Sequence, residues 1–288
     1  MQQRTILDRT VGAIGLGALP LSVEGRPDRA QALRTVHAAV AQGVTLIDTA
    51  DCYGIGQREH GHNEQLLAQA LAALPPADRD AVMVATKGGM YRTDDGAYHR
   101  DARPERLRAA CEASLRALGR DAVDLYQLHA VDPAVPFLES VGALADLQRE
   151  GKVRMVGLSN VTVAEIEAAR TLVTVASVQN RFSAVHRDSN AELAHCAATG
   201  IAFLPWAPLG GLAVRGGEPD RSAAFRTIAA ARGWSVQRVC LAWMLSLGDV
   251  VIPIPGASRP ESIQDSARAA DASLTPGELD AIIAASAG

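Results

Sequence analysis

The sequence has few aromatic residues and no long apolar run. Phe, Trp and Tyr make up only 4% of its 288 residues. No segment reaches the roughly 18 uninterrupted apolar residues that a membrane-spanning helix needs. The first residues, Met1-Gln2-Gln3-Arg4, lack the charged and apolar regions of a signal peptide. We therefore expect a cytoplasmic protein that has no membrane partner.

Cysteine pairs and a basic stripe are also missing. The formal net charge is -4, and Lys and Arg are scattered along the chain, so a nucleic-acid partner is not expected. His60 and His62 do not have the spacing of metal ligands, and we place them at a pocket rim or in solvent. The cysteines form no C-x-x-C pair, which argues against a zinc site or a disulfide framework, and no metal is expected. We interpret three of them as small apolar helix residues and the first as a loop thiol without a role; the four are Cys52, Cys111, Cys196 and Cys240.

Short apolar runs alternate with helix-like segments along the whole chain. Eight runs and no Pro/Gly-rich linker predict a closed (β/α)8 TIM barrel, with residues 1–288 as a single domain. The predicted strands are 11–17, 44–47, 82–86, 125–128, 155–158, 177–178, 201–205 and 250–254. The predicted helices include 30–42, 63–74, 104–118, 135–150, 163–172 and 275–285. Pro104 fits a first helical turn, and Asn63 and Thr162 are predicted N-caps.

Polar groups follow three of the predicted strands directly. Asp48 and Tyr53 come after the second strand, Lys87 after the third and His129 after the fourth. Carboxyl ends of barrel strands share one face, so these groups are expected to meet there. Two extended loops, 88–102 and 208–222, leave the same face, where binding sites are usually built. The first loop is expected to close over a substrate.

Six stretches follow one another in a fixed order along nearly the whole chain: Gly43–Gly54, Ala85–Gly88, Asp124–His129, Gly151–Asn160, Val178–Asn180 and Ile252–Gly256. Together they resemble the aldo-keto reductase superfamily. The resemblance implies a barrel that holds NADPH or NADH without a Rossmann glycine fingerprint, and no G-x-G-x-x-G opens a helix here. It implies an NADP-dependent enzyme that moves a hydride reversibly between NADPH and a small aldehyde or ketone.

Carbonyl reduction builds negative charge on the substrate oxygen, so the site needs a proton donor and hydrogen-bond donors there. Tyr53 is the expected acid, with a pKa lowered by the Lys87 ammonium. Asp48 would keep Lys87 charged, and His129 would donate to the same oxygen. Taken singly, the tyrosine could be packing, the lysine solvated and Asp48 a loop cap.

The resemblance assigns further residues to the cofactor. Ser159, Asn160 and Gln179 would bind the nicotinamide amide, although the first two could instead cap a helix. Trp206 stands where many relatives have a tyrosine that stacks on the nicotinamide, and it could otherwise be a core aromatic. The pyrophosphate loop would be Pro208, Leu209, Gly210 and Gly211, and the adenosine end would use Gly256, Ser258 and Arg259.

Arg259 is the main fixed cation for a 2′-phosphate, because the Lys and Arg that many relatives carry nearby are replaced by Gly256 and Ser262. This favours NADP over NAD. The sequence is similar to bacterial members that resemble pyridoxal reductases and sugar reductases. The alternative is a nucleotide-binding regulatory subunit resembling potassium-channel beta subunits. Substrate-pocket candidates, chosen by position, are Met90, Tyr91, Tyr98, Ala130 and Phe182.

Overall fold

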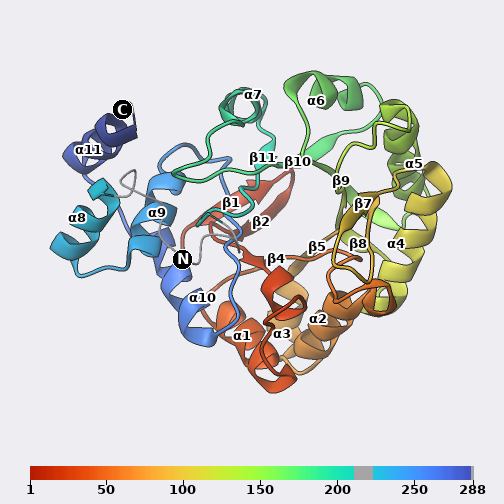
Figure 1. The fold of residues 1–288 in the computed structure, drawn as a ribbon, viewed down its shortest axis with the longest axis horizontal. Helices are drawn as coiled ribbons and strands as arrows, with labels where there is room; N and C mark the ends of the chain where they lie inside the picture. The colour runs from red at the N-terminus through yellow and green to blue at the C-terminus, as the bar shows by residue number, and fades with distance from the viewer. Residues whose placement is uncertain (211–222, 287–288) are drawn as a thin grey trace.

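The computed structural model describes residues 1–210 and 223–286. A curled sheet of parallel strands forms its centre, and helices surround the sheet (Figure 1). The sheet order is β11-β10-β9-β8-β5-β4-β3. These strands are β3 (Leu16–Gly17), β4 (Leu46–Asp48), β5 (Met83–Gly88), β8 (Val123–Leu128), β9 (Val153–Ser159), β10 (Val175–Gln179) and β11 (Ala202–Phe203).

An eighth segment, residues 250–256, closes the barrel between β11 and β3. Its bridges pair Phe203 with Val251 and Gly17 with Gly256. On the β11 side, Ile252 N–H donates to Phe203 O over 2.9 Å. On the β3 side, Pro253 and Pro255 accept from Gly15 and Gly17 but have no N–H to return. The predicted eighth strand is thus present as a barrel segment with an incomplete ladder.

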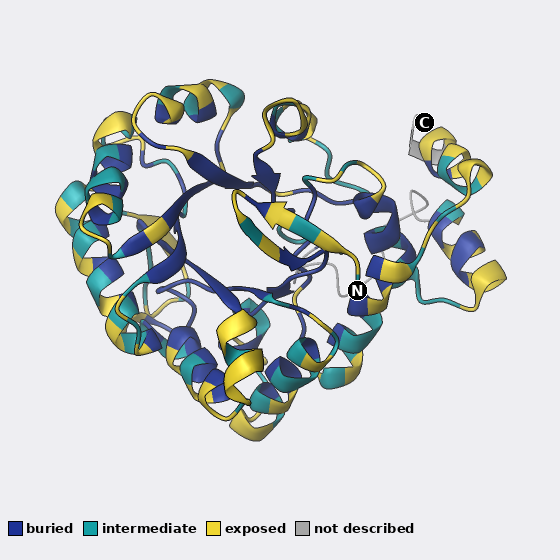
Figure 2. Cartoon of the chain, turned by 180° about the vertical axis from the view of Figure 1, so that it is seen from behind, coloured by how far each residue is buried: buried dark blue, intermediate teal, exposed yellow. Residues whose placement is uncertain are grey.

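The first predicted strand, 11–17, is wrong as a single unit. Residues β1 (Gln3–Ile6) and β2 (Arg9–Gly12) form an antiparallel hairpin, and only β3 joins the barrel. Ile6 and Val11 of the hairpin pack on the interior barrel residues Leu46 and Met83. Figure 2, which views the barrel from behind, shows the hairpin lying across the opening. In the sequence, β2 and β3 look like one strand because residues 11–17 are all buried.

Eleven α-helices lie in the described part of the chain, and none combines the length and apolar character of a membrane span. Their exposed sides face outward, while the strands are buried on both faces (Figure 2). They are α1 (Arg29–Ala41), α2 (His62–Ala72), α3 (Pro76–Ala81), α4 (Pro104–Leu118), α5 (Phe137–Arg149), α6 (Val163–Arg170), α7 (Asn190–Thr199), α8 (Ala223–Arg232), α9 (Val236–Leu245), α10 (Pro260–Ala267) and α11 (Pro276–Ser286).

Local sequence signals set several helix ends. Pro104 starts α4, and Thr162 forms the predicted capping box with Glu165 at the start of α6. The predicted N-cap Asn63 is wrong, because α2 begins one residue earlier, after Gly61. The buried Asn63 amide instead donates to Ala18 O and accepts from Thr49 Oγ1. It therefore ties together the loops that follow β3 and β4.

The segment 88–102, predicted as a loop, contains a β-hairpin of β6 (Met90–Arg92) and β7 (Tyr98–Arg100). The Arg92 guanidinium is buried and donates to Gly54 O over 2.6 Å. It also binds both carboxylate oxygens of Glu24, at 2.7 Å each. These bonds anchor the hairpin to the loop after β4.

Strand periodicity decides which side chains enter the barrel. Met83 and Ala85 point into the interior, so Lys87 on the same strand does as well. On β8, Leu125 is interior and Gln127 follows on the same face. Gly157 on β9 leaves room for this layer, because a Cβ there would lie 2.8 Å from Gln127 Cγ. The polar groups of neighbouring strands therefore converge at the carboxyl end.

Candidate active site

The ammonium of Lys87 lies at the centre of a buried polar cluster. Its Nζ donates to Asp48 Oδ2 over 2.6 Å, to Tyr53 Oη over 2.9 Å and to Thr49 O over 2.9 Å. The side chain has no exposed surface. These bonds use all three ammonium donors, which a buried lysine needs if it is to stay charged.

Asp48 is also held from the opposite side. Its Oδ1 accepts from Gln179 Nε2 over 2.7 Å and from Gln127 Nε2 over 3.2 Å. Gln127 was missed in the sequence, although an interior strand position two residues before His129 was a usable signal. The two amides fix the carboxylate so that its other oxygen faces Lys87.

Burial raises the pKa of Tyr53 well above its ordinary value, and the charge of Asp48 raises it further. The net pKa is therefore raised and not lowered as predicted, because burial outweighs the effect of the Lys87 ammonium. The phenol stays protonated at neutral pH and remains a proton donor. The Lys87 hydrogen bond to Tyr53 Oη would stabilise the phenolate once the proton has left.

His129 lies beside Tyr53 at the end of β8. The two rings meet edge to face, with centroids 5.9 Å apart. Burial lowers the pKa of His129 well below its ordinary range, and the charge of Lys87 adds to this effect. The imidazole is therefore neutral at neutral pH, with one N–H donor and one acceptor. Its Nδ1 is 3.7 Å from Cys52 Sγ, a contact that the sequence gave no reason to expect.

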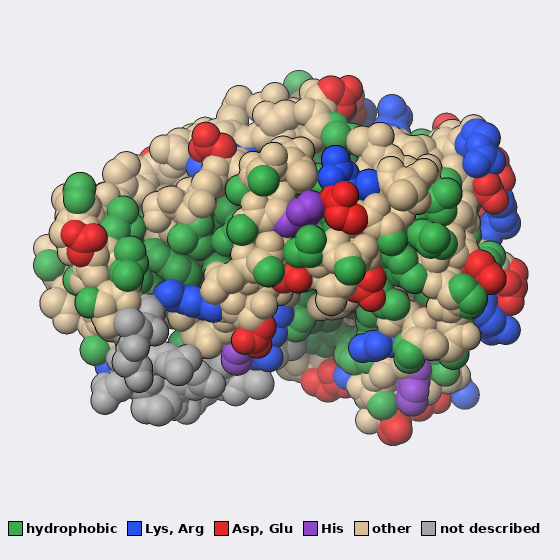
Figure 3. All heavy atoms as spheres, turned by 90° about the horizontal axis from the view of Figure 1, so that it is seen from above, with side chains coloured by type: hydrophobic (Ala, Val, Ile, Leu, Met, Phe, Trp, Pro, Cys, Tyr) green, Lys and Arg blue, Asp and Glu red, His purple; other side chains and the backbone are tan. Residues whose placement is uncertain are grey.

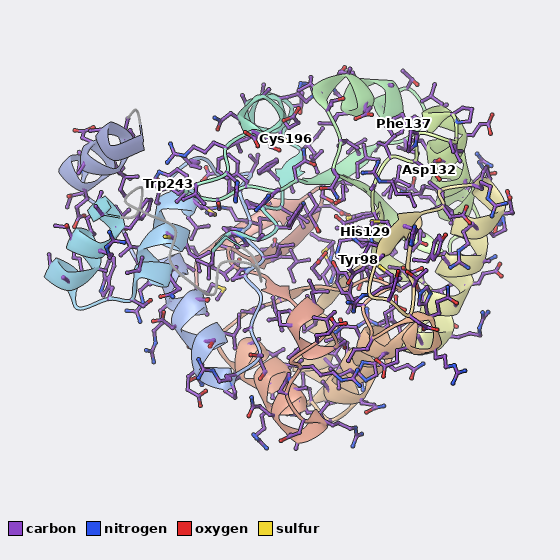
Figure 4. All side chains as sticks on the ribbon, in the orientation of Figure 1. Tyr98, His129, Asp132, Phe137, Cys196 and Trp243 are labelled. Atoms are coloured by element: carbon purple, nitrogen blue, oxygen red, sulfur yellow. The ribbon has the colours of Figure 1, made fainter. Side chains whose placement is uncertain are left out.

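A cavity of about 520 Å³ opens above this cluster. Figure 4 shows Tyr98 of β7 and His129 near the centre of the barrel. Lys87 lies beneath the cavity rather than on its wall. The predicted residues on the wall are Asp48, Tyr53, Met90, Tyr98, His129, Ser159, Asn160, Gln179, Trp206, Pro208, Leu209 and Gly256, and those not predicted are Gly17, Leu19, Pro20, Ala207 and Ile254.

Several predicted pocket residues do not line the cavity. Phe182 is buried between Phe203 and Trp243, and Tyr91 stacks on His99. Their exclusion follows from side-chain direction, which position in the sequence alone does not give. Ala130, Gly210, Ser258 and Arg259 are also outside the cavity wall, and Gly211 lies outside the described residues.

Trp206 and Asn160 are joined across the cavity rim. The indole Nε1–H donates to Asn160 Oδ1 over 3.0 Å, and Asn160 Nδ2 donates to His129 O over 2.9 Å. Asn160 therefore does not cap α6, which Thr162 caps. Trp206 is not a core aromatic, because its partly exposed ring faces the cavity. The guanidinium of Arg181 lies 5.8 Å from the Trp206 ring centroid.

Gly256 borders the cavity at a position that leaves little room for a side chain. A Cβ at Gly256 would lie 2.8 Å from Pro20 Cγ. Pro20 belongs to the short helix η1 (Leu19–Leu21), which borders the same cavity. A larger residue at 256 would require Pro20 to move.

A second cavity of about 460 Å³ lies on the outer side of the loop that carries Tyr53. Its wall includes the buried carboxyl groups of Asp51 and Glu64 together with Arg106. Burial raises the pKa of Asp51 to about 8, and the charge of Glu64 contributes. Asp51 Oδ1 and Glu64 Oε2 have no hydrogen-bond partner among the described residues.

The sequence also led us to expect no metal site and to place His60 and His62 at a pocket rim or in solvent. Among residues 1–210 and 223–286, no three His, Cys, Asp or Glu side chains are placed to hold a metal ion. His60 contacts the backbone of Arg92, and His62 contacts Ser22 Oγ. On the side drawn in Figure 3, the described acidic and basic side chains are intermixed.

A closed barrel with a buried Lys–Asp–Tyr cluster beneath a cavity at the carboxyl ends of its strands has the arrangement of the active site in a barrel enzyme. The model described as "Aldo/keto reductase family" matches residues 13–287. The chain therefore belongs to the aldo/keto reductase family, as the sequence predicted, and it is an oxidoreductase of carbonyl compounds.

Individual relatives agree with this family. The chain is 34% identical over 264 residues to the pyridoxine 4-dehydrogenase of Escherichia coli, covering 88% of this chain and 87% of the relative. It is similar to a solved glycerol dehydrogenase of Gluconobacter oxydans, with TM-score 0.85, 28% identity and coverage of 98% and 94%. A solved aldo/keto reductase of Klebsiella pneumoniae, in complex with NADP and acetate, has TM-score 0.78, 28% identity and coverage of 95% and 90%. The regulatory-subunit alternative gains no support from these relatives.

Proposed function

We propose that the protein reduces small uncharged aldehydes and ketones, with NADPH as the reductant and Tyr53 as the proton donor. The observation that carries this proposal is the Lys87 ammonium, buried and bonded to both Asp48 and Tyr53. When bound, NADPH supplies a hydride to the carbonyl carbon. The proton from Tyr53 goes to the carbonyl oxygen, so the two together convert the carbonyl to an alcohol.

The four residues act on one oxygen. His129 donates a hydrogen bond to the carbonyl oxygen and orients it, while Tyr53 delivers the proton. Lys87 stabilises the resulting phenolate across a 2.9 Å contact. Asp48 keeps Lys87 charged and in place. Donors fixed in this way need no rearrangement when charge develops, which is the main advantage of such a site.

The cavity wall fits a nicotinamide cofactor. Among described residues, the Gln179 side chain hydrogen-bonds only through Nε2, which leaves its Oε1 free to accept from a carboxamide N–H. Ser159 adds a hydroxyl on the same wall, and Trp206 offers a ring for stacking. The Asn160 side chain is already hydrogen-bonded to Trp206 and to the backbone of His129, so we propose that it fixes the cavity rim and does not bind the cofactor.

The remaining cofactor contacts are proposed for residues on the cavity wall and next to it in the sequence. Pro208 and Leu209, on the wall, would cover the pyrophosphate together with Gly210, and Gly256 and Ser258 would border the adenosine. Arg259 would bind the 2′-phosphate, since it is exposed at the N-cap of α10. The solved Klebsiella relative is a complex with NADP, which supports the choice of phosphate-bearing cofactor.

The proposal of an uncharged substrate follows from the wall chemistry. No lysine or arginine is among the described residues that line the cavity. A substrate carboxylate or phosphate would therefore lose its hydration without gaining a cation from the described wall residues. Met90 and Tyr98 from the hairpin supply apolar and aromatic surface near Tyr53. The similarity to a pyridoxine 4-dehydrogenase makes pyridoxal a suitable first substrate.

The first experiment replaces Tyr53 with Phe. Loss of the proton donor should lower kcat for pyridoxal or benzaldehyde by roughly 100-fold or more, with NADPH affinity nearly unchanged. Tyr91→Phe is the matched control, because that phenol stacks on His99 outside the cavity wall. Near wild-type turnover by Tyr53→Phe would show that another group is the acid.

The second experiment tests the substrate class with matched pairs. Pyridoxal is compared with pyridoxal 5′-phosphate, and benzaldehyde with 4-carboxybenzaldehyde. We expect kcat/KM to be at least about tenfold higher for each uncharged member, because a desolvated anion without a partner costs about 1.4 kcal/mol or more. Equal values would overturn the uncharged class while leaving the reduction itself intact.

A further inference from the structure

Cys52 lies directly against the imidazole that faces the substrate. Its Sγ is 3.7 Å from His129 Nδ1, and the thiol has no exposed surface. It packs with Ala50 and Tyr53, so the loop after β4 places both the proton donor and this thiol. The sequence placed Cys52 in a loop without a role.

Hydrogen bonds fix the backbone of His129, but among the described residues its ring has a single polar contact, the one between Nδ1 and Cys52 Sγ. His129 N–H donates to Gly88 O, and its carbonyl accepts from Asn160 Nδ2. The ring packs edge to face on Tyr53. No described residue bonds Nε2, and the side chain lines the substrate cavity. Nδ1 is therefore the protein-facing nitrogen and Nε2 the substrate-facing one.

A neutral imidazole has one proton, and the partner of one nitrogen decides which nitrogen carries it. Burial keeps the pKa of Cys52 well above its ordinary value, so the thiol retains its hydrogen. With the pKa of His129 lowered by burial, the ring is neutral. An S–H that donates to Nδ1 requires the ring proton to be on Nε2.

We propose that Cys52 is a positioning residue, which holds His129 in the Nε2–H tautomer by donating its S–H to Nδ1. The Nε2–H then points into the cavity and can donate to the carbonyl oxygen. In the opposite tautomer Nε2 would be an acceptor and would repel that oxygen. This inference rests on the proposed carbonyl reduction, but the tautomer can be observed without any substrate.

The test uses ¹⁵N NMR of histidine-labelled protein, with His129→Gln to assign the signal. The wild type should show His129 with its proton on Nε2. Cys52→Val, which fills a similar volume without a donor, should shift the ring toward a tautomer mixture. Cys52→Ser, which keeps a donor, should retain the Nε2–H form. Cys111→Val is the control, because Cys111 is a buried cysteine of α4 outside the cavity wall.

Kinetics give the second readout. Cys52→Val should lower kcat about twofold or more, since a tautomer mixture loses about half of the donor population, while the KM for NADPH stays within about twofold. Cys52→Ser should recover most of kcat. A wild-type His129 with its proton on Nδ1 would overturn the proposal even if the Val variant failed to fold.

An unchanged tautomer in Cys52→Val would also overturn the proposal. If the wild type reduced neither pyridoxal nor benzaldehyde but showed the Nε2–H form that Cys52→Val loses, the positioning contact would be supported and the proposed function would fail. The two failures are therefore distinguishable.

Discussion

Asp51 provides a test of how burial controls the charges behind the site. Its carboxyl group is buried, and one oxygen has no hydrogen-bond partner among the described residues. The perturbation is Asp51→Asn, which keeps the size of the side chain and removes its ability to ionise. The prediction is that this variant gains stability relative to the wild type as pH rises.

The sign follows from the direction of the pKa shift. Folding raises the pKa of Asp51 from 3.8 to about 8. Between these values the folded protein holds a proton that the unfolded chain has released. The free energy of unfolding of the wild type therefore falls as pH rises through this window. Asparagine does not titrate, so Asp51→Asn lacks this loss.

The size of the effect can be bounded. A rise from 3.8 to about 8 is about four units of about 1.4 kcal/mol each, so the largest loss is about 6 kcal/mol. The assay below spans only about 2.5 of these units, between pH 5.5 and about 8, which is about 3.5 kcal/mol. Water entering the second cavity screens the carboxylate, so we expect a little over half of this amount, about 2 kcal/mol. For a chain of this size, that corresponds to roughly 4 °C in Tm.

The assay is thermal and urea unfolding of both proteins at pH 5.5 and pH 9. The Tm difference between Asp51→Asn and wild type should grow by roughly 4 °C between these pH values. Asp78→Asn, at an exposed carboxylate of α3, is the matched surface control. If the Asp51→Asn difference is constant, the carboxylate is already ionised at pH 5.5 and the reasoning from burial is refuted.

Three further predictions concern the cofactor, the hairpin and a helix cap. Arg259→Ala should weaken NADPH binding by roughly 2 kcal/mol in titrations and leave NADH almost unchanged; equal weakening would place Arg259 away from the 2′-phosphate. Arg92→Ala should lower the free energy of unfolding by about 2 kcal/mol and raise substrate KM. The reason is that it removes the buried hydrogen bonds to Gly54 O and Glu24, which anchor the hairpin that carries Tyr98. Stability near that of wild type in urea unfolding would show that the anchor is dispensable. Thr162→Ala should cost about 1 kcal/mol in the same assay without changing kcat, since it removes only the cap of α6; a fall in kcat would link the cap to the site.

The sequence by itself determined the barrel and the meeting of its polar strand ends. A period of two along a buried strand fixes the face of each residue, so Lys87 must share the interior face of Met83 and Ala85. Local sequence also determined the helices. The predicted segments 104–118 and 163–172 are present as α4 and α6, and each ends within two residues of the predicted end. Capping and proline signals act over a few residues and need no tertiary information.

Only the tertiary structure decided the features that depend on distant neighbours. The run 11–17 divides between a hairpin and the barrel because Ile6 and Val11 fill the interior from outside the sheet. The shift of the Tyr53 pKa has the opposite sign to the predicted one, because depth of burial outweighs one nearby ammonium. The contact of Cys52 with His129 joins residues 77 positions apart. Burial and long-range contact are properties of the packed chain, so local patterns that place residues on a strand face leave both undetermined.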